Sequence, residues 1–344
     1  MPDLKLYTIA DLRAWLIHGM QIEGLNEHVI SPVRAWAIVH NPYVKDADNV
    51  VAAIYENGEL AAYAASFPDK IEGQRIWWCS TLFCHPHFSG RGYGLIVIGS
   101  LKESHEPEMT YDRWGAPETV MICEHLGLKT TYTKRYTLAW RTIRKNTLRS
   151  HVAYYRQEIQ RLFRQPACVS AGEYSLRYLN YIDGESYAFM QSQRKKDLWF
   201  REQTMFNWIL HYPFMQRCTL LKKAEHDCEF SANVSNYELQ VVKVYHKGVL
   251  IGIYILRRNA HSLNVVYLYY NAEKSDLVFA SIVDHVASIR PMSFVTDDVN
   301  LFSYVREKIY FPKRQEDSIS LSVPNDVVLP SMFTLQMGDG DSFA

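Results

Sequence analysis

The sequence predicts an α+β protein made of two tandem copies of one unit, each a mixed, mostly antiparallel sheet flanked by helices. The first reason is size, because 344 residues exceed what one ordinary hydrophobic core organises. The second is that landmarks in the first half of the chain recur in the same order in the second half. The third is a glycine-rich loop between an expected strand and an expected helix in the first half.

The repeat starts at the end of an amphipathic helix. Residues 36–43 and 208–214 each contain a tryptophan, then a histidine, then a proline followed by an aromatic residue. A proline at this position marks the point where a helix stops. Because His40 and His211 recur at the same place, we expect both to have a structural role at a helix end rather than a catalytic one.

The strands and helices that follow also match between the copies. Each copy has a hairpin turn between apolar or aromatic runs, at Asn57-Gly58 and at Lys247-Gly248. A strand, a helix, a short strand, a second helix and a final strand are expected next. In the first copy they are expected at 75–84, 95–103, 109–111, 118–126 and 134–140, and in the second at 262–270, 274–289, 292–296, 301–309 and 318–323. Two unrelated α+β domains with similar turn residues are the alternative.

The predicted division of the chain is a first domain at 1–145, a polar helical connector at 146–169, a second domain at 170–330 and a C-terminal tail at 331–344. The Gly/Asp-rich end of the tail, residues 337–344, is expected to be loose.

Composition and charge exclude several classes of protein. The 37 Lys and Arg residues balance the 37 Asp and Glu residues, so no global field recruits nucleic acid or an anionic membrane. No apolar run approaches the roughly 18 residues that a membrane helix needs, and the sequence has no signal-peptide pattern. The six cysteines contain no Cys-x-x-Cys pair, which argues against a disulfide framework and a structural zinc site. We therefore expect a cytoplasmic protein without a metal.

The stretch with the clearest chemical signal is the glycine-rich loop. Gly90, Gly92 and Gly94 follow a proline-stopped strand and open directly into a helix. Glycines leave backbone N–H groups free to converge on a ligand, and the first amides of a helix have no internal partners. A diphosphate is the natural occupant, and Arg91 can add a charge-assisted contact. Other phosphate loops fit worse, because a Walker loop needs Gly-Lys-Ser/Thr and a dinucleotide loop needs a glycine where Leu95 stands.

The loop resembles the phosphate loop of the GNAT superfamily, the GCN5-related N-acetyltransferases. Residues 82–86 match the strand end of that family, residues 89–94 match its loop, and residues 123–128 match its later helix-to-glycine signature. The likeness covers about residues 1–142 in motifs and about 170–325 only in the order of elements. At the equivalent loop position of the second copy, residues 271–276 have no glycine and a net negative charge, so this copy looks degenerate.

The resemblance implies that acetyl-CoA is the acyl donor and that its pantetheine arm pairs with the strand before the loop. The implied cofactor-binding residues are Leu82, Phe83, Cys84, Ser89, Gly90, Arg91, Gly92, Tyr93 and Gly94.

The catalytic residues are less clearly marked. Cys123 stands where many GNAT enzymes have a tyrosine that protonates the leaving thiolate, and the alternative is a buried cysteine that only fills space. The sequence does not identify a general base. Ser80 could hold a water molecule, and Asp112 and Glu118 are carboxylate alternatives whose structural roles are capping or solvation.

The function these features predict is transfer of an acetyl or other short acyl group from CoA to an amine or hydroxyl of a small molecule, such as an amino sugar. The alternative is a non-catalytic CoA- or ligand-binding protein, favoured by the missing tyrosine and the missing base. Transfer of an aminoacyl group from tRNA would need a basic face, which the balanced charge argues against.

Overall fold

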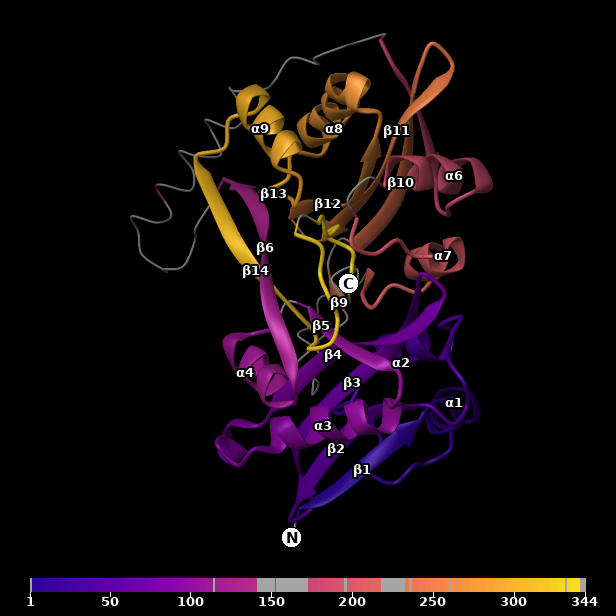
Figure 1. Cartoon of the computed structure of the whole chain (residues 1–344), viewed down its shortest axis with the longest axis vertical. Coiled ribbons are helices and arrows are strands. Elements are labelled where there is room, and N and C mark those ends of the chain that lie inside the picture. Colours follow the sequence, from indigo (N-terminus) through magenta and orange to yellow (C-terminus); the bar gives the residue numbers. More distant parts are fainter. Residues whose placement is uncertain are drawn as a thin grey trace. The chain divides into compact units, whose positions relative to one another are not determined.

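The computed structural model describes residues 2–113, 115–140, 152, 173–194, 197–217, 233–234, 237–259, 261–331 and 333–340 (Figure 1). Apart from Val152, the predicted connector at 146–169 lies outside the described residues. The chain forms two compact units. The first unit comprises Met1–Thr133, Lys196–Ser235 and Ile319–Ala344, and the second comprises Lys134–Lys195 and Asn236–Ser318.

The first unit is a mixed sheet with helices on both faces. Its strands lie in the order β1 (Asp3–Thr8), β2 (Asn49–Glu56), β3 (Glu59–Ile71), β4 (Gln74–Cys84), β5 (Met109–Arg113) and the end of β14 (Lys313–Pro324). Among these six strands the β4–β5 pair is parallel and the other four neighbouring pairs are antiparallel. The helices are α1 (Ile9–His18), α2 (Pro32–Val39), α3 (Tyr93–His105), α4 (Pro117–His125) and α7 (Gln203–His211), with a 3-10 turn η1 at Pro86–Phe88 and short strands β8 (Gln216–Arg217) and β9 (Asn233–Val234).

The second unit repeats this design. Its strands lie in the order β7 (Ser175–Leu179), β10 (Tyr237–His246), β11 (Val249–Asn259), β12 (Ser262–Tyr270), β13 (Ser293–Thr296) and the end of β6 (Leu128–Ala139). The β12–β13 pair is the parallel one. The helices are α6 (Gly184–Gln193), α8 (Ser275–Ile289) and α9 (Val299–Lys308), with a 3-10 turn η2 at Ala272–Lys274.

The predicted fold class and the predicted repeat of elements are both confirmed. Every strand and helix expected from the sequence after the two hairpins is present, with ends shifted by a few residues. Both hairpins turn through left-handed residues, with φ of 55° and 83° at Asn57 and Gly58 and of 51° and 79° at Lys247 and Gly248. The domain boundaries read from the sequence stay a prediction, because the compact units are defined by contacts and draw on both halves of the chain.

The two halves of the chain exchange their final strands. In the first unit Leu321 and Ser322 of β14 pair with Arg113 and Asp112 of β5. In the second unit the end of β6 pairs with β13, for example Leu138 with Phe294. Each of these strands is 12 residues long, which lets one strand supply residues to both units. The sheet of each unit is therefore completed by the other half of the sequence.

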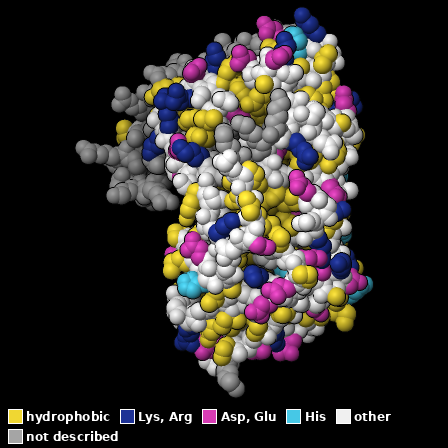
Figure 2. All heavy atoms as spheres, in the orientation of Figure 1, with side chains coloured by type: hydrophobic (Ala, Val, Ile, Leu, Met, Phe, Trp, Pro, Cys, Tyr) yellow, Lys and Arg dark blue, Asp and Glu magenta, His cyan; other side chains and the backbone are white. Residues whose placement is uncertain are grey.

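The surface carries no single dominant charge on the face drawn in Figure 2, where basic and acidic side chains are interspersed. No helix within the described ranges is both long and apolar enough to span a membrane.

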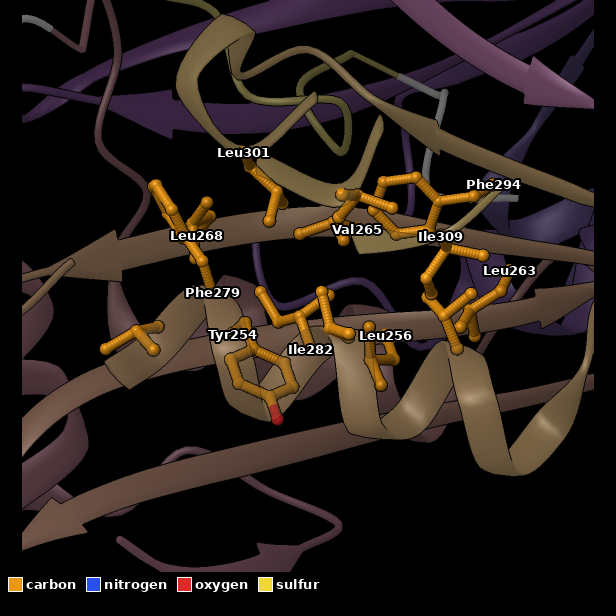
Figure 3. Close-up of a cluster of buried hydrophobic side chains, with 14 of the residues drawn as sticks. Tyr254, Leu256, Leu263, Val265, Leu268, Phe279, Ile282, Phe294, Leu301 and Ile309 are labelled. Carbon is orange, nitrogen blue, oxygen red and sulfur yellow. The ribbon is translucent and has the colours of Figure 1, made fainter. Parts of the chain in front are cut away.

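The core of each unit lies between its sheet and its helices. In the first unit α3 packs Val97 and Leu101 against the small side chains of Ala52, Ala62 and Ala64. In the second unit α8 and α9 cover β11, β12 and β13, and Figure 3 shows Phe279 and Ile282 of α8 packed on strand side chains. Each fully buried large apolar side chain contributes about 1.5–3 kcal/mol, so these layers hold the sheets in place.

The expectation of a loose C-terminal tail is wrong for the described part. Met337 and Asp339 are buried, with 2% and 3% of their surface exposed. Arg201 donates hydrogen bonds to the Gly338 and Gly340 carbonyls at 2.6 and 2.8 Å. A Gly/Asp-rich composition predicted mobility, but these backbone carbonyls satisfy a buried guanidinium.

Candidate functional site

A β-bulge interrupts β4 three residues before its end. Ala65 of β3 pairs with Ser80 and Ala64 pairs with Leu82, so Thr81 is the extra residue. Thr81 has a positive φ of 52°. A bulge of this kind bends a strand and redirects the side chains and backbone groups that follow.

Just before the bulge, β4 parts from its parallel neighbour. The β4–β5 pairing consists of Ile76 with Met109, Trp77 with Thr110 and Trp78 with Tyr111, all within the described residues. On its other edge β5 pairs with β14, at Asp112 and Arg113. The edge of β4 after Trp78 therefore no longer faces β5, and an extended ligand arm can pair with it as an additional strand.

The glycine loop follows this free edge. The chain passes through the η1 turn and then takes positive φ angles of 79° at Gly90 and 77° at Gly92, the N-cap of α3. A Cβ added at either glycine would meet nothing within 4 Å. No side chain caps the start of α3. The loop thus presents an open backbone surface at a helix N-terminus, where the partial charge is about +0.5.

The third glycine has a different role. A Cβ at Gly94 would lie 3.0 Å from Ile122 Cδ1 and 3.1 Å from Cys84 Sγ. Burial raises the pKa of the Cys84 thiol, and the nearby Gly94 backbone opposes this rise. Gly94 is therefore needed for the close packing of α3 on the end of β4 and on α4.

Arg91, expected to contact a diphosphate, binds a carboxylate of its own unit. Its Nη1 lies 2.6 Å from Glu56 Oε1 in the β2–β3 hairpin, and the Tyr93 hydroxyl donates to Glu56 Oε2 at 2.8 Å. Arg91 is exposed, so this pair contributes little to stability and can rearrange. The structure brings together the end of β4 and the loop, while the contacts of these residues with a cofactor stay a prediction.

Cys123 and Asp112 lie together on the α4 side of the first unit. Burial raises the pKa of the Cys123 thiol well above its usual range, and the Asp112 carboxylate raises it further, while a hydrogen bond with Ser322 lowers it. Cys123 is 1% exposed and Asp112 is 5% exposed. The cysteine is consequently a protonated thiol at neutral pH.

Ser80 lies on the other face of the sheet. Its neighbour Cys79 belongs to the cluster packed under α3, and adjacent strand residues point to opposite faces. The buried Ser80 hydroxyl accepts a hydrogen bond from Arg34 Nη1 of α2 at 2.9 Å. Glu118 is exposed in the first turn of α4, where a carboxylate favours the helix dipole. The predicted catalytic residues therefore do not form one cluster.

His40 and His211 occupy the helix-end positions expected for them. His40 Nδ1 lies 2.8 Å from the Trp36 carbonyl and His211 Nδ1 lies 2.7 Å from the Asn207 carbonyl, each at the end of its helix. His85 Nδ1 accepts a hydrogen bond from the His87 N–H within the η1 turn. In the ranges that the structure describes, no three His, Cys, Asp or Glu residues are grouped to hold a metal ion.

Several buried polar residues around this site escaped the sequence reasoning. Arg201 binds Asp69, and the Asp69 carboxylate also accepts a hydrogen bond from Trp78 Nε1 at 3.0 Å. Ser322 of β14 is buried and pairs with Asp112 of β5. Each partner lies far away in the sequence, so the one available signal was polar residues within otherwise apolar strands.

Comparison with known proteins supports the fold. No protein-family model matches the sequence, and no curated protein matches it either. A tandem GNAT protein from the clavulanic acid biosynthesis pathway superposes with a TM-score of 0.51 at 11% identity, covering 95% of this chain and 100% of that one.

Two further solved structures superpose on this chain at lower similarity. A GCN5-related N-acetyltransferase from Anabaena variabilis has a TM-score of 0.49 at 12% identity, covering 93% of this chain and 72% of that one. Another from Sphaerobacter thermophilus has a TM-score of 0.47 at 12% identity, covering 97% and 98%. With its two repeated units, this chain has the tandem GNAT fold.

Proposed function

We propose that the protein is a cytoplasmic acyltransferase that moves an acetyl or other short acyl group from CoA to an amine or hydroxyl of a small molecule. The observation that carries this proposal is the open glycine loop at the N-terminus of α3, directly after the strand that parts from its parallel neighbour. Amino sugars are the first acceptor class to test.

In this proposal the CoA diphosphate binds the backbone amides from Gly90 to Gly94. The pantetheine arm pairs with the free edge of β4 at Leu82 and Cys84, which directs the thioester to the point where β4 and β5 part. Binding both reactants there converts a bimolecular reaction into an effectively intramolecular one. Backbone N–H groups near the bulge polarise the thioester carbonyl.

The acceptor nitrogen or oxygen attacks the thioester carbon, the new bond forms and the C–S bond breaks. The leaving thiolate takes the proton of the Cys123 thiol, and the attacking group loses its own proton to water. Cys123 recovers a proton from solvent. The Cys123 thiol holds a proton at neutral pH, as a proton donor must, while its burial lowers its acidity.

The second unit does not bind a diphosphate in this proposal. At the equivalent of the glycine loop, Asn271 caps the η2 turn by accepting the Glu273 N–H at 2.9 Å. Glu273 and Asp276 place negative charge in the first turns there. An anion would be repelled rather than bound.

Binding of CoA without turnover is the second candidate. It is favoured by the burial of Cys123, which makes the thiol a weak acid, and by the absence of any carboxylate or imidazole in the sequence of β4. Measured thioester cleavage separates it from the first candidate.

The test is calorimetric titration of the full chain with acetyl-CoA. We expect micromolar binding, weakened at least about 30-fold in Gly92→Glu because the new carboxylate repels the diphosphate and occupies its site. Gly73→Glu is the matched control, since Gly73 has a φ of 84°, equally open surroundings and a place at the other end of β4. Equal affinity in the two variants would remove the loop assignment, and no binding by the unaltered chain would remove the proposed function.

A further inference from the structure

A carboxylate contacts the glycine loop, where the proposed ligand is an anion. Glu56 ends β2, on the face where Ala52 and Ile54 pack under α3. Its Oε1 accepts a hydrogen bond from Arg91 Nη1 at 2.6 Å, and its Oε2 accepts one from the Tyr93 hydroxyl at 2.8 Å. Both partners belong to the segment that is proposed to bind the diphosphate.

The Arg91 side chain is held on two sides. Its guanidinium carbon lies 5.3 Å from the centroid of the Phe88 ring, and its Nη1 binds Glu56. While this ion pair is closed, the Glu56 carboxylate neutralises the charge that Arg91 brings to the loop. The side chains of Arg91 and Glu56 are 49% and 18% exposed. An ion pair that water can reach is weak, so a competing anion can open it.

We propose that Glu56 is an internal competitor of the acyl donor. Its carboxylate occupies Arg91 in the free protein, and a phosphate group of CoA takes its place on Arg91 when the donor binds. The inference rests on the proposed function, because Glu56 has nothing to compete with unless an anion binds the loop.

The chemistry of the two anions explains why the exchange is possible. The closed pair uses one terminal nitrogen of the guanidinium, whereas arginine commonly binds a phosphate through two parallel hydrogen bonds. Opening the pair leaves the Glu56 carboxylate beside a bound phosphate of like charge, which opposes binding. The donor affinity is therefore the gain from the Arg91–phosphate contact less the loss of the Arg91–Glu56 contact. Removing the carboxylate should tighten binding.

The second unit shows that the scaffold does not require this carboxylate. Glu56 lies two positions before the glycine of its hairpin, and His246 lies two positions before the glycine of the second hairpin. The Nδ1 atom of His246 lies 2.7 Å from the Glu173 carbonyl, a contact with the backbone. The unit without a glycine loop thus has no carboxylate at this position, which supports a role for Glu56 at the loop.

The first test is calorimetric titration of the full chain with acetyl-CoA. We expect Glu56→Gln to bind about fivefold more tightly, the factor that corresponds to the loss of one exposed ion pair. Glu59→Gln is the matched control. Glu59 is exposed on the same hairpin and is the cross-strand partner of Glu56, while Arg91 pairs with Glu56. Glu59→Gln removes the same charge without opening the pair and should change the affinity by less than about twofold.

Arg91 must carry the gain if Glu56 acts by competition. Adding Arg91→Gln to Glu56→Gln should return the affinity to that of the unaltered chain, because the freed guanidinium is then missing. Equal gains in Glu56→Gln and Glu59→Gln would show an effect of net charge alone and overturn the inference. A gain that persists without Arg91 would overturn it as well.

A measurement without substrate tests the ion pair itself. In NMR spectra of the full chain with isotope-labelled arginine, the guanidinium signals of Arg91 are identified by their loss in Arg91→Gln. We expect them to shift in Glu56→Gln and to stay in place in Glu59→Gln, and unshifted signals in Glu56→Gln overturn the inference. If the signals shift but neither the unaltered chain nor Glu56→Gln binds acetyl-CoA, the proposed function fails and the inference fails with it. If both bind acetyl-CoA equally well, the inference alone is overturned.

Discussion

The buried ion pair between Asp69 and Arg201 allows the sharpest stability prediction. Arg201 Nε donates to Asp69 Oδ2 at 2.7 Å, and the two side chains are 2% and 0% exposed. The same guanidinium donates hydrogen bonds to the Gly338 and Gly340 carbonyls of the C-terminal tail. Arg201→Met keeps the apolar stem but leaves a buried carboxylate without this cation.

Breaking one partner of a buried ion pair costs about 3–5 kcal/mol, because the remaining charge stays buried. This is a large part of the roughly 5–15 kcal/mol that holds a domain together. The matched control is Arg13→Met, whose pair with Asp46 is exposed at 37% and 71% and is worth at most about 1 kcal/mol.

The assay is urea unfolding of the full chain followed by tryptophan fluorescence, which reports on Trp78 beside Asp69. We expect the midpoint to fall much further in Arg201→Met than in Arg13→Met. Adding Asp69→Asn to Arg201→Met should recover part of the loss, because the uncompensated charge is gone. Equal effects of Arg201→Met and Arg13→Met would refute the reasoning.

Three further predictions follow from the same unit. Gly94→Ala should lower stability by about 1–3 kcal/mol and weaken acetyl-CoA binding, since its Cβ would crowd Ile122 and Cys84; calorimetry and thermal unfolding check this. Burial raises the pKa of Asp339 to about 7, so only the folded state holds this proton between pH 4 and 7 and stability should fall as pH rises through that window, by up to about 1.4 kcal/mol per pH unit. The Tm of Asp339→Asn should decline less than that of the unaltered chain between pH 5 and pH 8. A fragment of residues 1–145 should lack cooperative unfolding, because the first unit also needs Lys196–Ser235 and Ile319–Ala344.

Local chemistry explains why so many elements could be predicted. The left-handed turns at Asn57-Gly58 and Lys247-Gly248 need residues that tolerate positive φ, and those residues are visible in the sequence. The same holds for the proline that begins α2 and the glycine N-cap of α3. Such signals depend on neighbours within a few residues, so one sequence is enough to find them.

The exchange of final strands could not be predicted in this way. The alternation of residues in β14 shows that Leu321 faces an apolar layer, but it carries no information on which sheet supplies that layer. The pairing of the buried charges could not be predicted for the same reason. Asp69 and Arg201 are separated by 132 positions, and only the folded chain shows that they neutralise each other.

Comparing the two units shows which part of the site reflects ligand binding and which reflects the fold. In the second unit Val266 is the extra residue between the Ile255–Tyr267 and Leu256–Val265 pairs. The parallel β12–β13 pairing also ends after three residue pairs, as it does in the first unit. A bulge and parting strands are therefore properties of the repeated scaffold, present whether or not a loop follows.

The glycine loop, by contrast, is present in the first unit and replaced in the second by a turn with Glu273 and Asp276. Two positive φ angles with open space beside them, at Gly90 and Gly92, cost conformational entropy on folding and fill no core. The second unit forms the same strand–helix junction without them, so the scaffold does not require them. A ligand that approaches the backbone closely is the remaining reason for these glycines. The acyl-CoA proposal therefore depends on the loop and not on the shape of the sheet.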